Sequence, residues 1–64
     1  MTNERPSVQL NERYSVFATC EHLKIHRNTL RRYEERCLIN PSFHPSGLKF
    51  FFGSEILRFW EDTL

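Results

Sequence analysis

Residues 25–39, IHRNTLRRYEERCLI, predict one short helix with two different sides. At about 100° per residue, one half of the helical wheel collects the long polar side chains, namely Arg27, Asn28, Arg31, Arg32, Glu35 and Arg36. The other half holds Leu30, Tyr33 and the methyl group of Thr29, which can pack on a core. Outward arginine and asparagine side chains offer the donors that base edges and phosphates accept. Taken alone, the stretch also fits a solvated helix face without a ligand.

The preceding residues predict another helix close to this one. Ser15 is a candidate N-cap. Residues that can pack on a core follow it with i, i+3, i+4, i+7 spacing: Val16, Thr19, Cys20 and Leu23. We expect a helix of about two turns there, and a second helix from about residue 27 to residue 36 with His26 or Asn28 as its cap. The short connection between them is typical of a helix-turn-helix.

A β-hairpin and a third helix are predicted after the second helix. Residues 48–52 form an aromatic run without a breaker, which is typical of a strand. Their simplest partner is 39–43, with the tip at 44–47, where proline and glycine favour a turn. Ser54 is the candidate N-cap of the third helix. That helix turns large apolar residues to one side: Ile56, Phe59 and Trp60.

These elements predict one small domain in residues 14–64, mainly α with a small β-hairpin. Residues 1–13 are polar and show no period, so we expect a flexible N-terminal arm there. The net charge is only +1, but the cations gather between Lys24 and Arg36, whereas carboxylates gather on the third helix. This asymmetry favours one face that meets a polyanion.

Several function classes are disfavoured by the composition. The two cysteines lack metal-ligand spacing to each other or to the three histidines, so we expect no metal site. So short a chain leaves no room for a catalytic cleft, and we expect no enzyme, cofactor or small-molecule effector. Neither a signal peptide nor a membrane span of about 20 apolar residues is present, so we expect a cytoplasmic protein that does not bind membranes.

A further set of residues falls in one ungapped register: Tyr14-Ser15-Val16, Ile25-His26, Thr29-Leu30-Arg31-Arg32-Tyr33-Glu34, Leu38-Ile39, Pro41, Gly47, Lys49 and Phe51. In these residues the chain resembles the DNA-binding domain of the MerR family and its small excisionase-like relatives. The resemblance implies a winged helix-turn-helix. In that fold the second helix enters the major groove of double-stranded DNA, and the hairpin wing grips the backbone beside it.

The resemblance also implies a set of DNA-contacting residues: Arg27, Asn28, Thr29, Arg31, Arg32, Tyr33 and Lys49. The first two would begin the helix and face base edges. Arg31, Arg32 and Tyr33 would lie near the groove wall, and Lys49 would neutralise a phosphate from the wing. For Tyr33, packing against the core is an equal alternative.

Four positions depart from the family pattern. Lys24 and Cys37 replace glycines, and a positive φ at either would strain a non-glycine residue by roughly 1 kcal/mol or more. Phe43 replaces the first wing arginine, and Arg32 replaces an aromatic residue. The first pair bears on turn geometry and the second pair on DNA contacts.

Within the family, we expect an excisionase-like recombination directionality factor that bends DNA. Transcriptional members carry a long dimerising helix and an effector domain after the third helix, and we expect neither here. The partners that this role implies are double-stranded DNA and either an integrase or further copies of the protein on DNA. A small transcriptional regulator is the alternative. A protein-interaction module on the same fold is a third interpretation, motivated by Phe43 and the low net charge.

Overall fold

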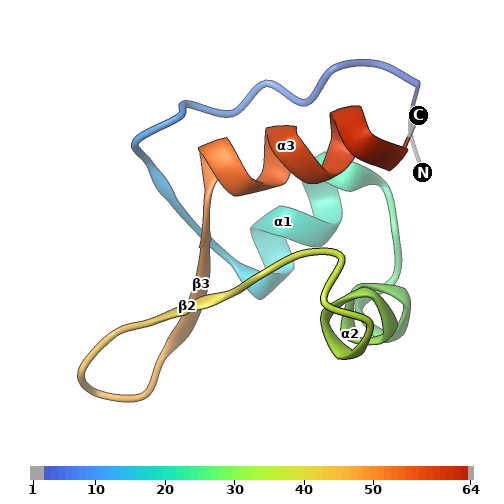
Figure 1. The fold of residues 1–64 in the computed structure, drawn as a ribbon. Helices are drawn as coiled ribbons and strands as arrows, with labels where there is room; N and C mark the ends of the chain where they lie inside the picture. The colour runs from blue at the N-terminus through green and yellow to red at the C-terminus, as the bar shows by residue number, and fades with distance from the viewer. Residues whose placement is uncertain (1–2, 64) are drawn as a thin grey trace.

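A computed structural model describes residues 3–63 as three helices and a three-stranded antiparallel sheet (Figure 1). The elements in chain order are β1 (Arg13–Ser15), α1 (Val16–Leu23), α2 (Arg27–Glu35), β2 (Ser42–Phe43), β3 (Lys49–Phe52) and α3 (Gly53–Thr63). The predicted combination of three helices with a small hairpin is confirmed. Residues 1–2 of the predicted arm and Leu64 of the predicted domain lie outside the described residues.

Side chains cap both helices of the first pair as the sequence predicts. The Ser15 Oγ accepts a hydrogen bond from the Ala18 N–H at 3.1 Å and starts α1. The His26 Nδ1 accepts from the Asn28 N–H at 3.1 Å and starts α2. Of the two candidate caps for α2, the structure therefore selects His26.

Both of these helices are followed by a residue with left-handed backbone. Lys24 has a φ of 58° and Cys37 a φ of 59°. At the end of α2, the Leu38 N–H donates to the Tyr33 carbonyl at 2.9 Å, which satisfies one of the helix's last acceptors. The same type of closure ends α1. The two positions where the family pattern has glycine therefore do have positive φ.

Strand β3 is the centre of the sheet. Strand β2 pairs with it antiparallel, with Phe43 opposite Lys49, so the predicted hairpin is confirmed. Its first strand is shorter than the predicted 39–43, because Ile39 is buried in the core and Pro41 has no N–H to donate. Strand β1, on the other edge of β3, is not predicted by the sequence, because three residues are too few to show a period.

The core lies between the helices and one face of the sheet. Its fully buried residues are Thr19, Leu23, Leu30, Ile39, Phe51, Ile56 and Phe59. Cys20 and Trp60 belong to the same core cluster. Phe51 supplies the inward side chain of β3, while Phe50 and Phe52 stack edge to face on the other side with ring centroids 5.2 Å apart.

The prediction that Ser54 caps α3 is wrong. The helix begins at Gly53, and the Gly53 and Ser54 N–H groups donate to the Glu12 and Leu10 carbonyls at 3.0 and 3.1 Å. Backbone acceptors thus replace a capping side chain. A Cβ at Gly53 would collide with the Gln9 carbonyl, so glycine permits this close approach.

The predicted arm contacts the domain in ways that its sequence does not signal. Pro6 is buried, and Val8 packs against the core. Figure 1 shows the segment running along α3 before it enters β1. Arg13, assigned to the arm, is the first residue of β1, so the predicted boundary at residue 13 falls inside an element. The flexibility of residues 1–13 stays a prediction.

Candidate nucleic-acid interface

Helix α2 presents a cationic face to solvent. The exposed residues of this face and of the helix end are Arg27, Asn28, Arg31, Arg32, Glu35 and Arg36. On the other side Leu30 is fully buried, and the Tyr33 ring packs on the Phe59 ring with centroids 5.1 Å apart. Because Leu30 and Tyr33 anchor the helix on the core, its arginines point away from the globule.

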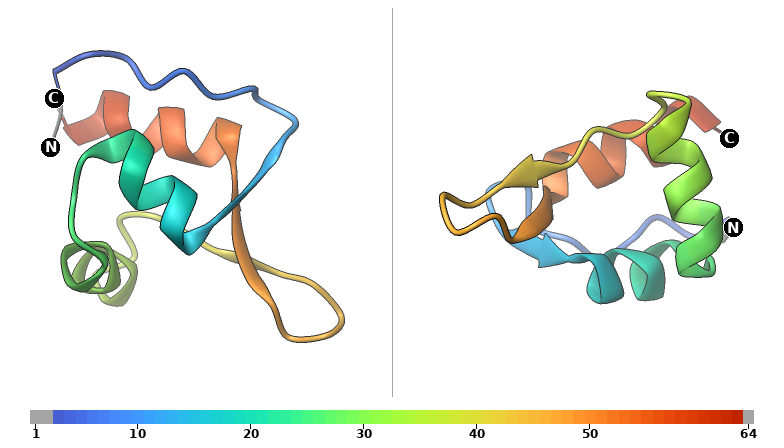
Figure 2. Two further views of the ribbon diagram at one scale, coloured as in Figure 1. Left: turned by 180° about the vertical axis from the view of Figure 1, so that it is seen from behind. Right: turned by 90° about the horizontal axis from the view of Figure 1, so that it is seen from below.

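The exposed helix and the hairpin loop lie on the same side of the molecule. In Figure 1, α2 and the loop between β2 and β3 both project downward, away from α3 and the N-terminal segment. The right-hand view of Figure 2 faces this side and shows α2 and the hairpin at opposite ends. The whole molecule measures 34 × 24 × 17 Å, so a single surface can present both elements to one extended ligand.

The charge on the α2 face is largely uncompensated. Arg31 Nε lies 3.6 Å from the Glu35 carboxylate, and both side chains are well exposed, so water and salt screen this pair. Among residues 3–63, no carboxylate lies within ion-pairing distance of Arg27, Arg32 or Arg36. These three guanidinium groups keep their donors available for an anion.

Lys49 has a partner inside the protein. Its Nζ lies 2.7 Å from Glu34 Oε1, and the Glu34 side chain is only 13% exposed. This ion pair joins β3 to α2. The sequence does not predict it, because the two residues lie on different elements and no spacing rule relates them. A phosphate contact by Lys49 stays a prediction, and a phosphate would have to compete with Glu34.

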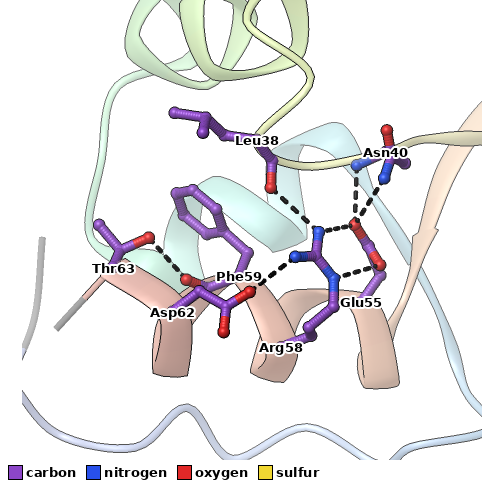
Figure 3. Close-up of polar contacts among 7 residues, drawn as sticks. All are labelled: Leu38, Asn40, Glu55, Arg58, Phe59, Asp62 and Thr63. Carbon is purple, nitrogen blue, oxygen red and sulfur yellow. Dashed lines mark hydrogen bonds and ion pairs between the residues drawn. The ribbon is translucent and has the colours of Figure 1, made fainter.

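Helix α3 fixes the segment that leaves α2. The Arg58 guanidinium donates to the Leu38 carbonyl at 3.0 Å and also binds the Glu55 and Asp62 carboxylates (Figure 3). The Glu55 carboxylate in turn accepts from the Asn40 N–H at 2.9 Å. These bonds hold the chain just after α2 against the body of the protein, and so help to set where α2 lies.

The same contacts alter proton affinities. The hydrogen bond from Arg58 lowers the pKa of Glu55 below its ordinary value of 4.5, against an opposing effect of burial. The Glu55 contact raises the pKa of Arg58 in return. Both groups are therefore charged at neutral pH.

The remaining predicted site residues of α2 are less exposed than its arginines. Thr29 and Tyr33 are half-buried on the flanks of α2.

Both cysteines are free thiols, and burial raises the pKa of Cys20. In the part of the chain that the structure describes, no cluster of three metal-ligating side chains occurs. Nor does any described helix have the length and apolar character needed to cross a bilayer.

Comparisons with known proteins identify no relative of the chain. No protein-family model, no curated protein and no solved structure matches the chain. The resemblance to the MerR family, which rests on the residue pattern from Tyr14 to Phe51, therefore stays a prediction.

Proposed function

We propose that the protein binds double-stranded DNA with sequence specificity, as a winged helix-turn-helix. Helix α2 would lie in the major groove, and the β2–β3 hairpin would lie against the duplex beside it. The observation that carries the proposal is the outward arginine face of α2, backed by the buried Leu30 and placed on the same side as the hairpin.

The dimensions and the side chains of α2 suit this role. An α-helix about 10–12 Å across fits a major groove about 12 Å wide. Arginine pairs in bidentate fashion with guanine, and asparagine with adenine, so Asn28 and the neighbouring arginines can read bases. The arginines that do not reach a base edge would bind phosphates and fix the register of the helix.

Within this class we propose an excisionase-like architectural role. Each copy would bend the duplex, and copies in phase would curve it for an integrase. A small transcriptional regulator would use the same interface. The two roles differ in consequence: the first changes the direction of recombination when an integrase and its attachment sites are present, and the second changes transcription alone.

The test begins with selection of a binding site from a random duplex library, followed by anisotropy titrations at several salt concentrations. We expect log K to fall linearly with log[salt], because phosphate neutralisation releases counterions. Replacing both Arg31 and Arg32 with alanine should flatten the salt slope and weaken binding, by about tenfold to a hundredfold for each of the two arginines that reads a base. Unchanged affinity would show that the interface does not include Arg31 and Arg32.

A matched pair of charge changes sharpens the test. Glu35→Gln removes the carboxylate beside Arg31, and Glu61→Gln removes an exposed carboxylate on α3. Each raises the net charge by one. If α2 is the interface, Glu35→Gln should tighten binding clearly more than Glu61→Gln, because electrostatic attraction falls off over about 10 Å at 0.1 M salt. Equal effects would indicate a non-specific response to net charge.

A protein-interaction module is the second candidate. It is favoured by exposed aromatic side chains, with Phe17 74% and Phe43 60% exposed. An interaction module would retard no duplex at micromolar protein concentration, and the Arg31 and Arg32 substitutions would not alter its partner binding in a salt-dependent way.

A further inference from the structure

We propose that Phe43 and Leu48 form an apolar wedge at the end of the hairpin, which enters the minor groove beside the α2 site and kinks the duplex there. The proposal rests on the proposed DNA-binding function. It assigns the bending to two named side chains and gives the hairpin a role other than phosphate neutralisation.

The wedge consists of two exposed apolar side chains on opposite faces of the hairpin. Phe43 is 60% exposed and Leu48 is 69% exposed. Phe43 pairs with Lys49 across the strands, so it lies on the face of Lys49. Leu48 comes one residue earlier in the chain and turns to the other face, since side chains alternate. The two positions that flank the tip therefore present apolar side chains on both sides of the hairpin.

The hairpin offers little free charge to a phosphate. Lys49 is the only lysine or arginine in residues 42–52, and Glu34 holds its ammonium group. The His44 Nδ1 accepts from the Ser46 N–H at 3.2 Å and lies 3.0 Å from the Ser46 hydroxyl. A hairpin so arranged gains more from apolar contact with deoxyribose and base edges than from the phosphate backbone.

The tip is held by short backbone bonds. The Gly47 N–H donates to the His44 carbonyl at 2.7 Å, and the His44 N–H donates to the Leu48 carbonyl at 2.9 Å. Pro45 restricts its own φ, and Gly47 supplies the φ of 92° that closes the turn. A braced tip can hold Phe43 and Leu48 in place against the resistance of stacked bases.

The position of the tip allows it to reach the neighbouring groove. The hairpin lies on the side that bears α2, at the opposite end (Figure 2). The molecule is 34 Å long, which is about one turn of DNA, so a major groove and the flanking minor groove both fall within its span. Phenylalanine and leucine are among the side chains that minor-groove proteins insert between base steps, with kinks of about 20–90°.

The experiment measures binding and bending on the same duplex. A site selected by the unaltered protein is placed at the centre of a duplex with donor and acceptor dyes at its ends, and energy transfer reports the bend. We expect a bend of at least about 20°, and a reduction by half or more in the variant that carries both Phe43→Ala and Leu48→Ala. The affinity of this variant should fall less than that of the Arg31 and Arg32 variant.

Two control variants accompany the measurement. Leu10→Ala removes another exposed leucine, 55% exposed, from the N-terminal segment, and should leave the bend unchanged. Phe43→Met retains a large apolar side chain of a kind that inserts between base steps. With Leu48 unchanged, this variant should keep most of the bend that the double alanine variant loses. Circular dichroism of each variant checks that the fold persists, as expected for exposed positions.

The outcomes separate the two proposals. Binding without a bend, or a bend that survives the double substitution, overturns the wedge and leaves DNA binding intact. A bend that Leu10→Ala reduces equally also overturns the wedge. If the unaltered protein binds no duplex, the proposed function and the wedge fall together.

Discussion

Lys49 Nζ lies 2.7 Å from Glu34 Oε1, and this contact ties the central strand β3 to the exposed helix α2. The resemblance to MerR domains implies that Lys49 neutralises a DNA phosphate, whereas in the structure Lys49 binds the Glu34 carboxylate. The Glu34 carboxylate and a DNA phosphate would compete for the Lys49 ammonium group. The relative orientation of hairpin and helix depends in part on which of the two binds it.

We expect Lys49→Met to affect folding more than DNA binding. Loss of the partly buried ion pair should lower the free energy of unfolding by about 1 kcal/mol, because Glu34 loses its partner. The salt slope of DNA binding should change by clearly less than one phosphate contact. Urea denaturation and salt-dependent anisotropy measure the two effects. A slope reduced by about one, at unchanged stability, would restore the phosphate contact to Lys49.

Lys24 and Cys37 occupy left-handed backbone positions that glycine would relieve. Lys24→Gly and Cys37→Gly should each raise the free energy of unfolding by about 1 kcal/mol. Lys24→Ala and Cys37→Ala keep a Cβ and should give no such gain. The sites lie at the ends of different helices, so the two glycine effects should add within about 0.5 kcal/mol. Destabilisation by either glycine would show that the native φ is not strained.

Ser15 and Ser54 give a direct comparison of a capping serine with a serine that only resembles a cap in sequence. Ser15→Ala removes the acceptor for the Ala18 N–H and should cost about 1 kcal/mol. Ser54→Ala should change stability by less than about 0.5 kcal/mol, because backbone carbonyls already serve the start of α3. Thermal and urea unfolding followed by circular dichroism would distinguish them. A large loss of stability in Ser54→Ala would show that the Ser54 side chain caps α3.

Glu55 should make stability fall in acid. Its pKa is lower in the folded protein than the ordinary value of 4.5, so the folded state binds this proton less readily than the unfolded chain. The contribution is complete above 4.5 and is lost as the pH falls through the folded pKa. Glu55→Gln should therefore be less stable than the unaltered protein at pH 7, with a difference in the free energy of unfolding that shrinks on acidification.

The control for this pH effect is Glu61→Gln, which removes an exposed carboxylate from the same helix. Between neutral and acid pH, the difference in the free energy of unfolding between Glu55→Gln and the unaltered protein should change more than the difference for Glu61→Gln. If Glu55→Gln and the unaltered protein lose stability in parallel, the bond from Arg58 does not contribute to the acid sensitivity.

Local patterns predicted the parts of the fold in which neighbours in sequence determine structure. The apolar spacing behind Ser15 and the two-sided wheel around Leu30 predicted α1 and α2 nearly to the residue. The aromatic run predicted β3, and the positive φ at Lys24 and Cys37 agrees with their places in the family pattern. These features depend on interactions within a few residues along the chain.

Contacts between distant segments could not be predicted in this way. Strand β1 exists because Arg13 lies beside Phe52, and α3 begins early because Leu10 and Glu12 offer carbonyls to it. The Lys49–Glu34 pair likewise joins two elements. No periodicity or motif in one segment encodes such a partner in another. The DNA contacts of α2 stay predictions for the same reason, since their partner is another molecule.

The bonds from the start of α3 to Glu12 and Leu10 also bear on how the chain is made. Because the donors and acceptors lie about forty residues apart, most of the chain must be synthesised before these hydrogen bonds can form. The hydrogen bonds within α1 and α2 are local and can form earlier, whereas the Leu10 and Glu12 carbonyls lack these partners until Ser54 and Gly53 have been made. A nascent chain held in the exit tunnel should therefore resist protease only after residues beyond Ser54 have emerged.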